Sequence, residues 1–356
     1  MSEETAQKLR RVRALLGADL DAIVLRRTGS VAWLSGGGRT HISSTSPIGV
    51  AAVVVHPDTV TVVTAVNEAD RLAREELGGL DATWTVLPWD TDLTTELPDG
   101  PRIGTDLPYG GCRDVAGPLE AARRSLTVAE ADRYRALGAD AAVVLTDVCQ
   151  RTEPNQSEYE AAAAVAAGLI ERAIDPVVLL VAGAERLPHH RHPLPTGAVL
   201  GDLAMIVACG RRQGLIVSLT RFVSHRRLDP ETTERYHRLL LVDGAFNDAT
   251  RTGATVGEVF QAGAGSYAGA GFDPEEWHLH HQGGPTGYAT REWLATAASE
   301  AMIEERQAFA WNPSVAGLKC EDTVIAHAGP PEVLTVDPRW PTTLVEGLAR
   351  PLILEV

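Results

Sequence analysis

Residues 204–223 read AMIVACGRRQGLIVSLTRFV, two apolar runs separated by a short polar segment. Continuous apolar runs bounded by turn residues indicate buried β-strands, so we predict strands over 204–210 and 214–223. Upstream, DPVVLLVAG (175–183) indicates a third buried strand. These three segments predict that the second half of the chain is built around a sheet.

Helix signals flank these strands. The stretches 127–130 (TVAE) and 157–160 (SEYE) are capping boxes, in which a hydroxyl caps the third amide and a glutamate reaches back. We expect helices after both boxes, and further helices over 231–253 and 257–271, the last rich in small residues. The C-terminal segment alternates short strands and turns.

The first third of the chain alternates strand and helix patterns. A helix is expected over 5–16, a strand over 22–26, two β runs in 49–66 around the turn 56–58, a helix over 67–79 and a strand over 82–89. This alternation predicts a compact three-layer α/β domain over 1–124, followed by a second domain over 125–356.

Composition excludes several classes of protein. The 356 residues carry a net charge of −15, which argues against nucleic acid and anionic membranes as partners. No apolar run approaches the ~18 residues of a membrane span. The four cysteines lack CxxC spacing, as expected for a reduced cytoplasmic protein. Lysine occurs only at Lys8 and Lys319; the bias toward arginine is typical of a GC-rich, bacterial genome.

Polar groups gather in three segments: RLPHHRHPLPT (186–196), WHLHHQGGPTGY (277–288) and LKCEDTVIA (318–326). Prolines stiffen the first, glycines let backbone approach a ligand closely in the second, and the third places Glu321 and Asp322 in an apolar strand. Each has a structural alternative, because single histidines often lie in cores and acidic pairs protect sheet edges. We predict a site where the three segments converge.

The order of these motifs resembles the "pita-bread" family of methionine aminopeptidase, aminopeptidase P, prolidase and creatinase. The resemblance is carried by Gly201-Asp202, Leu219-Thr220-Arg221, the turn after His281, and the stretch 321–324 (EDTV). It implies an α/β (α+β) architecture with a creatinase-type N-terminal domain (1–124) and a pita-bread catalytic domain (125–356). It also implies a homodimer.

The resemblance further implies five metal-ligand positions for two divalent ions. In this sequence they fall on Ala208, Ser218, His281, Asn312 and Glu321, so three of the five, including both aspartates, are replaced. One carboxylate and one imidazole leave about one negative charge against four positive ones. We therefore expect no dinuclear centre and no metal cofactor. His278, His280 and His281 with Glu321 are an alternative zinc set, but consecutive strand residues point to opposite faces, so all three histidines are not expected to converge.

Resemblance to creatinase, a metal-independent enzyme, implies a histidine proton shuttle. His190 or His192 would take that role; His190 keeps the better spacing to Gly201-Asp202, and His192 directly precedes Pro193. His281 is then the second imidazole and Glu321 the orienting carboxylate. The expected function is a metal-independent hydrolase or lyase acting on a C–N bond of a small amide, amidine or amino-acid-like substrate.

Six further residues are expected to bind substrate: His280, His278, Arg221, Asn312, Gln282 and Ser218. Asn312 carries no charge and disfavours a strongly cationic substrate, whereas Arg221 favours a carboxylate. The structural alternative is that Arg221 pairs with Asp202 or Glu321. Two other functions stay open: a non-catalytic peptide-binding pseudo-peptidase, and an Xaa-Pro aminopeptidase-like peptidase with one atypical metal. The density of histidines favours an enzyme acting on a small molecule or short peptide.

Overall fold

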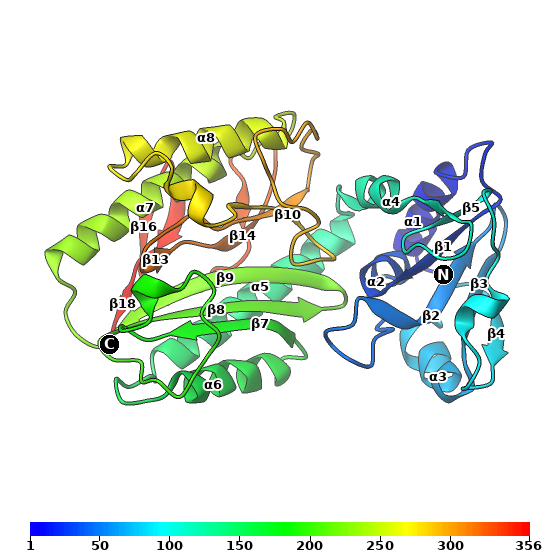
Figure 1. Cartoon of the computed structure of the whole chain (residues 1–356), viewed down its shortest axis with the longest axis horizontal. Coiled ribbons are helices and arrows are strands. Elements are labelled where there is room, and N and C mark those ends of the chain that lie inside the picture. Colours follow the sequence, from blue (N-terminus) through cyan, green and yellow to red (C-terminus); the bar gives the residue numbers. More distant parts are fainter. The chain divides into compact units, whose positions relative to one another are not determined.

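The computed structural model describes residues 1–356 and divides into two compact units (Figure 1). Unit 1 comprises residues 1–130 with 213–215, and unit 2 comprises 131–212 with 216–356. Both mix helices and strands, in agreement with the expected fold class. None of the helices combines the length and apolar character that crossing a membrane requires.

Unit 1 is built on a six-stranded sheet of order β4-β3-β2-β1-β5-β6. The strands β2 and β3 pair antiparallel on either side of the turn 56–58, as predicted. The strands are β1 (Ala22–Arg27), β2 (Ile48–Val55), β3 (Val60–Ala65), β4 (Thr83–Leu87), β5 (Ile103–Thr105) and β6 (Arg113–Asp114). The helices are α1 (Glu3–Ala14), α2 (Thr28–Ser35), α3 (Val66–Arg71), which continues as a short π-helix over Leu72–Glu76, and α4 (Ala116–Arg123).

Unit 2 contains the helices α6 (Glu158–Ile170), α7 (Pro230–Ala249) and α8 (Val256–Gly269) and most of α5 (Val128–Cys149), whose first residues belong to unit 1. Both predicted capping boxes form. Glu130 N donates to Thr127 Oγ1 over 3.2 Å while Thr127 N donates to Glu130 Oε2 over 2.8 Å, and Ser157 and Glu160 repeat the arrangement at α6. Local sequence therefore determines where these two helices start.

The predicted strand pair becomes β8 (Leu203–Arg212) and β9 (Leu215–Ser224), and both are almost entirely buried. They belong to a sheet of order β18-β9-β8-β7, with β7 (Asp175–Ala182) and β18 (Leu354–Glu355). A second, antiparallel sheet has the order β10-β11-β14-β15, formed by β10 (Gly283–Thr286), β11 (Ala308–Trp311), β14 (Asp322–Ile325) and β15 (Glu332–Val333). The pairs β12 (Ser314–Val315) with β13 (Leu318–Lys319), and β16 (Thr342–Val345) with β17 (Leu348–Pro351), are separate hairpins.

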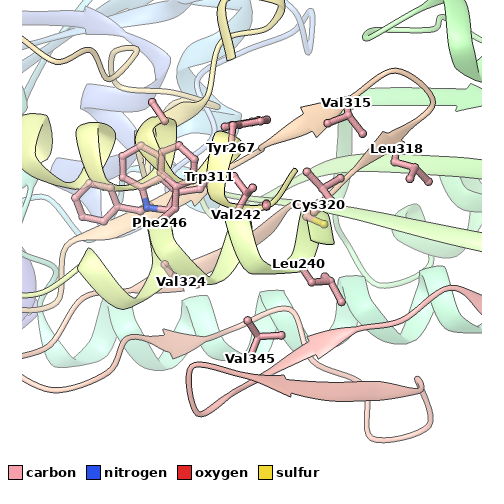
Figure 2. Close-up of a cluster of buried hydrophobic side chains, with 14 of the residues drawn as sticks. Leu240, Val242, Phe246, Tyr267, Trp311, Val315, Leu318, Cys320, Val324 and Val345 are labelled. Atoms are coloured by element: carbon pink, nitrogen blue, oxygen red, sulfur yellow. The ribbon is translucent and has the colours of Figure 1, made fainter. Parts of the chain in front are cut away.

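An aromatic core fixes β11 against the helices α7 and α8 (Figure 2). The ring of Trp311 stacks on Phe246 with centroids 5.0 Å apart, and its Nε1 donates to Thr250 Oγ1 over 2.8 Å. Gly263 on α8 lies so close to Phe246 that a Cβ atom would come within 2.3 Å of the ring. This packing holds the end of β11, where Asn312 follows.

Candidate functional site

Three imidazoles converge in unit 2. The potential ligand nitrogens of His192, His280 and His281 all lie within 4.8 Å of one another. The Nε2 atoms of His192 and His280 are 2.9 Å apart, and the rings of His280 and His281 have centroids 4.6 Å apart. His280 is buried, His281 is partly buried and His192 is exposed, so the cluster opens toward solvent on one side. We call these three residues the histidine trio.

Local backbone structure explains how adjacent residues join one cluster. A short 3₁₀ turn (Glu276–Leu279) ends at His280, and β10 begins only at Gly283. The Gln282 amide Nε2 donates to the carbonyls of Trp277 (3.1 Å) and His280 (2.6 Å), which closes the turn. The expectation that His278, His280 and His281 do not all converge holds, because His278 lies outside the cluster. Strand alternation is not the reason, however, since His280 and His281 precede the regular strand and lie in the same cluster. The third member is His192 rather than His278.

Gly283 anchors this segment to β11. Its φ is +95°, and an added Cβ would lie 2.1 Å from the Ala310 carbonyl oxygen, so only glycine fits. Next to it, Asn312 N donates to Gln282 O over 3.1 Å. Glycine at position 283 thus allows β10 to pair closely with β11.

Glu321 is held between two cations. Its Oε1 lies 2.7 Å from Arg291 Nη2, and its Oε2 lies 2.7 Å from Lys319 Nζ. Thr220 Oγ1 also donates to Oε2 over 3.1 Å. The side chains of Glu321, Lys319 and Arg291 are 3%, 5% and 11% exposed, so water screens the pairs weakly. Burial disfavours the carboxylate, but Lys319 and Arg291 outweigh it and lower the pKa of Glu321 to about 2.

Burial and nearby positive charges favour the neutral form of all three imidazoles by lowering the pKa of each. Burial, followed by the charge of Lys319, lowers the pKa of His280 to about 2. Burial and the charge of Arg291 lower the pKa of His281 to about 4, and burial and Lys319 also lower that of His192. Neutral imidazoles can accept protons or bind metal ions.

Three buried polar atoms of this site have no hydrogen-bond partner: His281 Nδ1, Asn312 Oδ1 and Arg291 Nε. Ser218 is better satisfied, with its Oγ 3.2 Å from Cys209 Sγ and 3.4 Å from Arg291 Nη1. Ala208, also buried, contributes no donor atom. Orphaned polar groups are rare in protein interiors and commonly mark the place of a ligand or an ordered water.

Several sequence candidates lie elsewhere. Arg221 pairs with Asp322 over 2.9 Å and donates to the Thr335 carbonyl over 2.6 Å, so it pairs with neither Asp202 nor Glu321. With 4% of its side chain exposed and these bonds formed, Arg221 stabilises the contact of β9 with Asp322 and Thr335.

His278 and His190 are both exposed. His278 Nε2 lies 3.0 Å from Glu275 Oε2, and its ring stacks on Trp277. His190 follows the short turn Leu187–His189 and is not a member of the trio. Of the two candidate shuttle residues, the structure therefore places His192 beside His281.

Sequence reasoning missed Lys319 and Arg291 as site residues. Lys319 did carry a signal, because it is one of only two lysines in an arginine-rich chain. Arg291 carried none: it lies after β10 in a segment without periodicity, 30 residues before its partner Glu321.

The sequence of the chain matches the model of one known protein family. Residues 132–328, more than half of its length, match the model of metallopeptidase family M24. The chain belongs to this family. The match covers the histidine trio, Glu321 and both cations. It confirms the pita-bread resemblance and supports a hydrolase.

Solved structures of the family share the fold at low identity. A prolidase from Pyrococcus horikoshii superposes with a TM-score of 0.79 at 16% identity, covering 94% of this chain and 99% of that one. Dipeptidase PepE from Mycobacterium ulcerans gives 0.77 at 18% identity, covering both chains completely (100% each). The N-terminal domain of the FACT complex subunit SPT16 from Cicer arietinum (chickpea) gives 0.70 at 15%, covering 93% and 96%. No curated protein matches the chain.

Proposed function

We propose that this M24 protein hydrolyses a C–N bond of a small amide, amidine or amino-acid-like substrate without the dinuclear metal centre of its family. The main observation in support is that Glu321 is ion-paired with two side-chain cations. Each of its carboxylate oxygens is bonded to a side-chain cation, one to Arg291 and one to Lys319.

The residues at the five expected ligand positions do not fit two metal ions. Ala208 offers no donor, and Ser218 and Asn312 are neutral. Glu321 supplies the only negative charge of the set, and Lys319 and Arg291 already exceed that charge. Two dications in this place would repel each other and both side chains, with no anion left to offset the repulsion.

The same cations can assist hydrolysis directly. The net positive charge of Lys319, Arg291 and Glu321 favours the negative charge that develops on a substrate oxygen when water attacks its carbon. Lys319 is buried, Arg291 is partly buried, and both are held in place by Glu321, so little reorganisation is needed as that charge develops.

The trio supplies the proton transfers. Neutral His192 or His281 accepts the proton of the attacking water while the C–O bond forms. The resulting imidazolium gives this proton to the nitrogen as the C–N bond breaks, so protons and electrons balance without a co-reactant. Gln282 keeps the His280–His281 turn closed through its bonds to two carbonyls.

The test is turnover in the presence of a chelator. Purified protein kept in EDTA is assayed against a panel of dipeptides, N-acyl amino acids and amidines for release of an amine or ammonia. We expect activity that survives EDTA, and a loss of about 10²–10⁴-fold in His281→Ala and His192→Ala. His237→Ala is the matched control, because His237 is an exposed histidine of helix α7 outside the trio.

Activity that EDTA abolishes and manganese or cobalt restores would contradict the proposal. Binding of a peptide without turnover would instead support the pseudo-peptidase alternative.

A further inference from the structure

The histidine trio presents three nitrogen donors on one site. His192, His280 and His281 lie within 4.8 Å of one another through their potential ligand atoms, and one edge of the cluster is exposed. We propose that the trio binds a single zinc-class transition-metal ion, and that this ion inhibits the hydrolase. The binding site stands on the geometry alone, whereas the inhibition rests on the proposed function.

The spacing of the nitrogens suits one tetrahedral ion. With Zn–N bonds of about 2.0–2.1 Å, neighbouring ligand nitrogens lie roughly 3.3 Å apart. The Nε2 atoms of His192 and His280 are 2.9 Å apart, and the remaining donors lie within 4.8 Å. Small ring rotations would bring all three to bonding distance and leave a fourth position on the exposed side.

The surroundings orient the buried ring. His280 Nδ1 lies 3.0 Å from Ser314 Oγ, which leaves Nε2 turned toward His192. Ser314 is itself held by Arg191 Nη1 (3.1 Å) and by the Tyr267 hydroxyl, which accepts from Ser314 N over 3.1 Å. In metal sites, one ring nitrogen of a histidine binds the metal and the other usually forms a hydrogen bond that fixes the orientation of the ring.

The third ring has an unmet polar atom. His281 Nδ1 is buried with no hydrogen-bond partner in the protein. A buried imidazole nitrogen that has lost its hydrating water and has no hydrogen-bond partner destabilises the protein. A ligand bound to this nitrogen would remove that free-energy penalty. This orphaned atom is a second observation, independent of the spacing, that points to a missing ligand.

This site differs from the two-metal positions of the family. Only His281 is common to both sets. A single ion meets no second dication, and imidazole nitrogens rather than bridging carboxylates supply its bonds. Lys319 and Arg291 act on the trio and repel the ion, but Glu321 offsets one of their two charges, so the opposing charge is smaller than for two ions. Imidazole donors favour zinc, copper, nickel and cobalt over magnesium, calcium and manganese, which prefer oxygen.

The bound ion would inhibit hydrolysis because it occupies the lone pairs of the imidazole nitrogens. An imidazole nitrogen bonded to a metal ion has no lone pair left to accept a proton. If His192 or His281 transfers protons in the reaction, the bound ion removes that capacity. Zinc would thus compete with catalysis for the same nitrogens.

The experiment measures binding apart from activity. Protein freed of metal by chelator and dialysis is titrated with ZnCl₂ by calorimetry and with CoCl₂ by absorption spectroscopy, which reports tetrahedral nitrogen ligation. We expect one ion per chain, no binding of MgCl₂, and a loss of affinity greater than the 10–100-fold typical of outer-shell changes in His280→Ala.

His237→Ala is the matched control and should bind like the wild type, since His237 is an exposed histidine of helix α7 outside the trio. His280→Gln serves as a second variant should the alanine variant unfold, with folding checked by circular dichroism. Absence of stoichiometric zinc binding, or unchanged affinity in both His280 variants, overturns the site.

The two proposals fail separately. If zinc binds at one ion per chain and raises turnover, the site stands and the inhibition is wrong; metal-free hydrolysis is also wrong if the EDTA-treated protein shows no turnover. If zinc does not bind and the EDTA-treated protein turns over substrate, the proposed function stands and the metal site is wrong.

Discussion

Replacing Glu321 by glutamine in metal-free protein tests directly what this carboxylate does. In the structure it separates buried Lys319 from partly buried Arg291, and each of the two cations lies 2.7 Å from one of its oxygens. Removing one partner of a buried ion pair typically costs about 3–5 kcal/mol, because the remaining charge is left uncompensated. Glutamine still accepts one hydrogen bond, so we expect the lower end, about 3 kcal/mol.

The assay is unfolding by heat and by urea in EDTA buffer. For a domain of 150–250 residues, about 2–4 °C of Tm corresponds to 1 kcal/mol, so Glu321→Gln should lower Tm by roughly 10 °C. Glu300→Gln is the matched control, since Glu300 is an exposed residue of the same type, and it should change stability by less than ~0.5 kcal/mol.

A double variant tests whether the loss of stability comes from the uncompensated charges of Lys319 and Arg291. Adding Lys319→Met to Glu321→Gln removes one of the two stranded cations, so part of the lost stability should return. A site evolved to hold metals would behave in the opposite way in EDTA, because neutralising a ligand carboxylate relieves repulsion. A Glu321→Gln protein as stable as wild type would refute the reasoning.

Three further predictions concern the supports of the site. Gln282→Ala removes the donor that closes the turn before β10, and we expect a loss of about 1–3 kcal/mol in urea unfolding and a lower kcat. Gly283→Ala forces a Cβ to within 2.1 Å of the Ala310 carbonyl, so we expect at least 1–3 kcal/mol of destabilisation by the same measurement, roughly that of overpacking. Arg135 bonds both oxygens of Glu332 and lowers its pKa from the ordinary 4.5, so this carboxylate stabilises the fold above pH 4.5 and ceases to do so as pH falls through its folded pKa. The Tm difference between wild type and Glu332→Gln should therefore shrink on acidification, and a constant difference would count against the ion pair.

Much of the fold could be predicted because its signals are local. The capping boxes at Thr127 and Ser157 determine where α5 and α6 begin, and both formed as expected. Apolar runs gave β8 and β9 to within a few residues, because strands buried on both faces carry continuous hydrophobic sequence.

The site was only partly accessible to the same reasoning. His192 and His281 were candidates from the sequence, and the structure brings them together with His280. The expectation that His278 stays apart from His280 and His281 was met, but its premise of strand alternation does not apply, because the chain forms a turn there. Arg291 reaches Glu321 from an irregular segment, and no local pattern encodes such a distant pairing.

The most direct test of the account is the number of metal ions that the chain retains. Wild type and Glu321→Gln are incubated with excess manganese, cobalt or zinc, desalted, and analysed by mass spectrometry for metal per chain. We expect no manganese, and at most one zinc or cobalt per chain, in both proteins, since Glu321 already neutralises part of the charge of Lys319 and Arg291. Two ions per wild-type chain that are lost in Glu321→Gln would contradict the central claim.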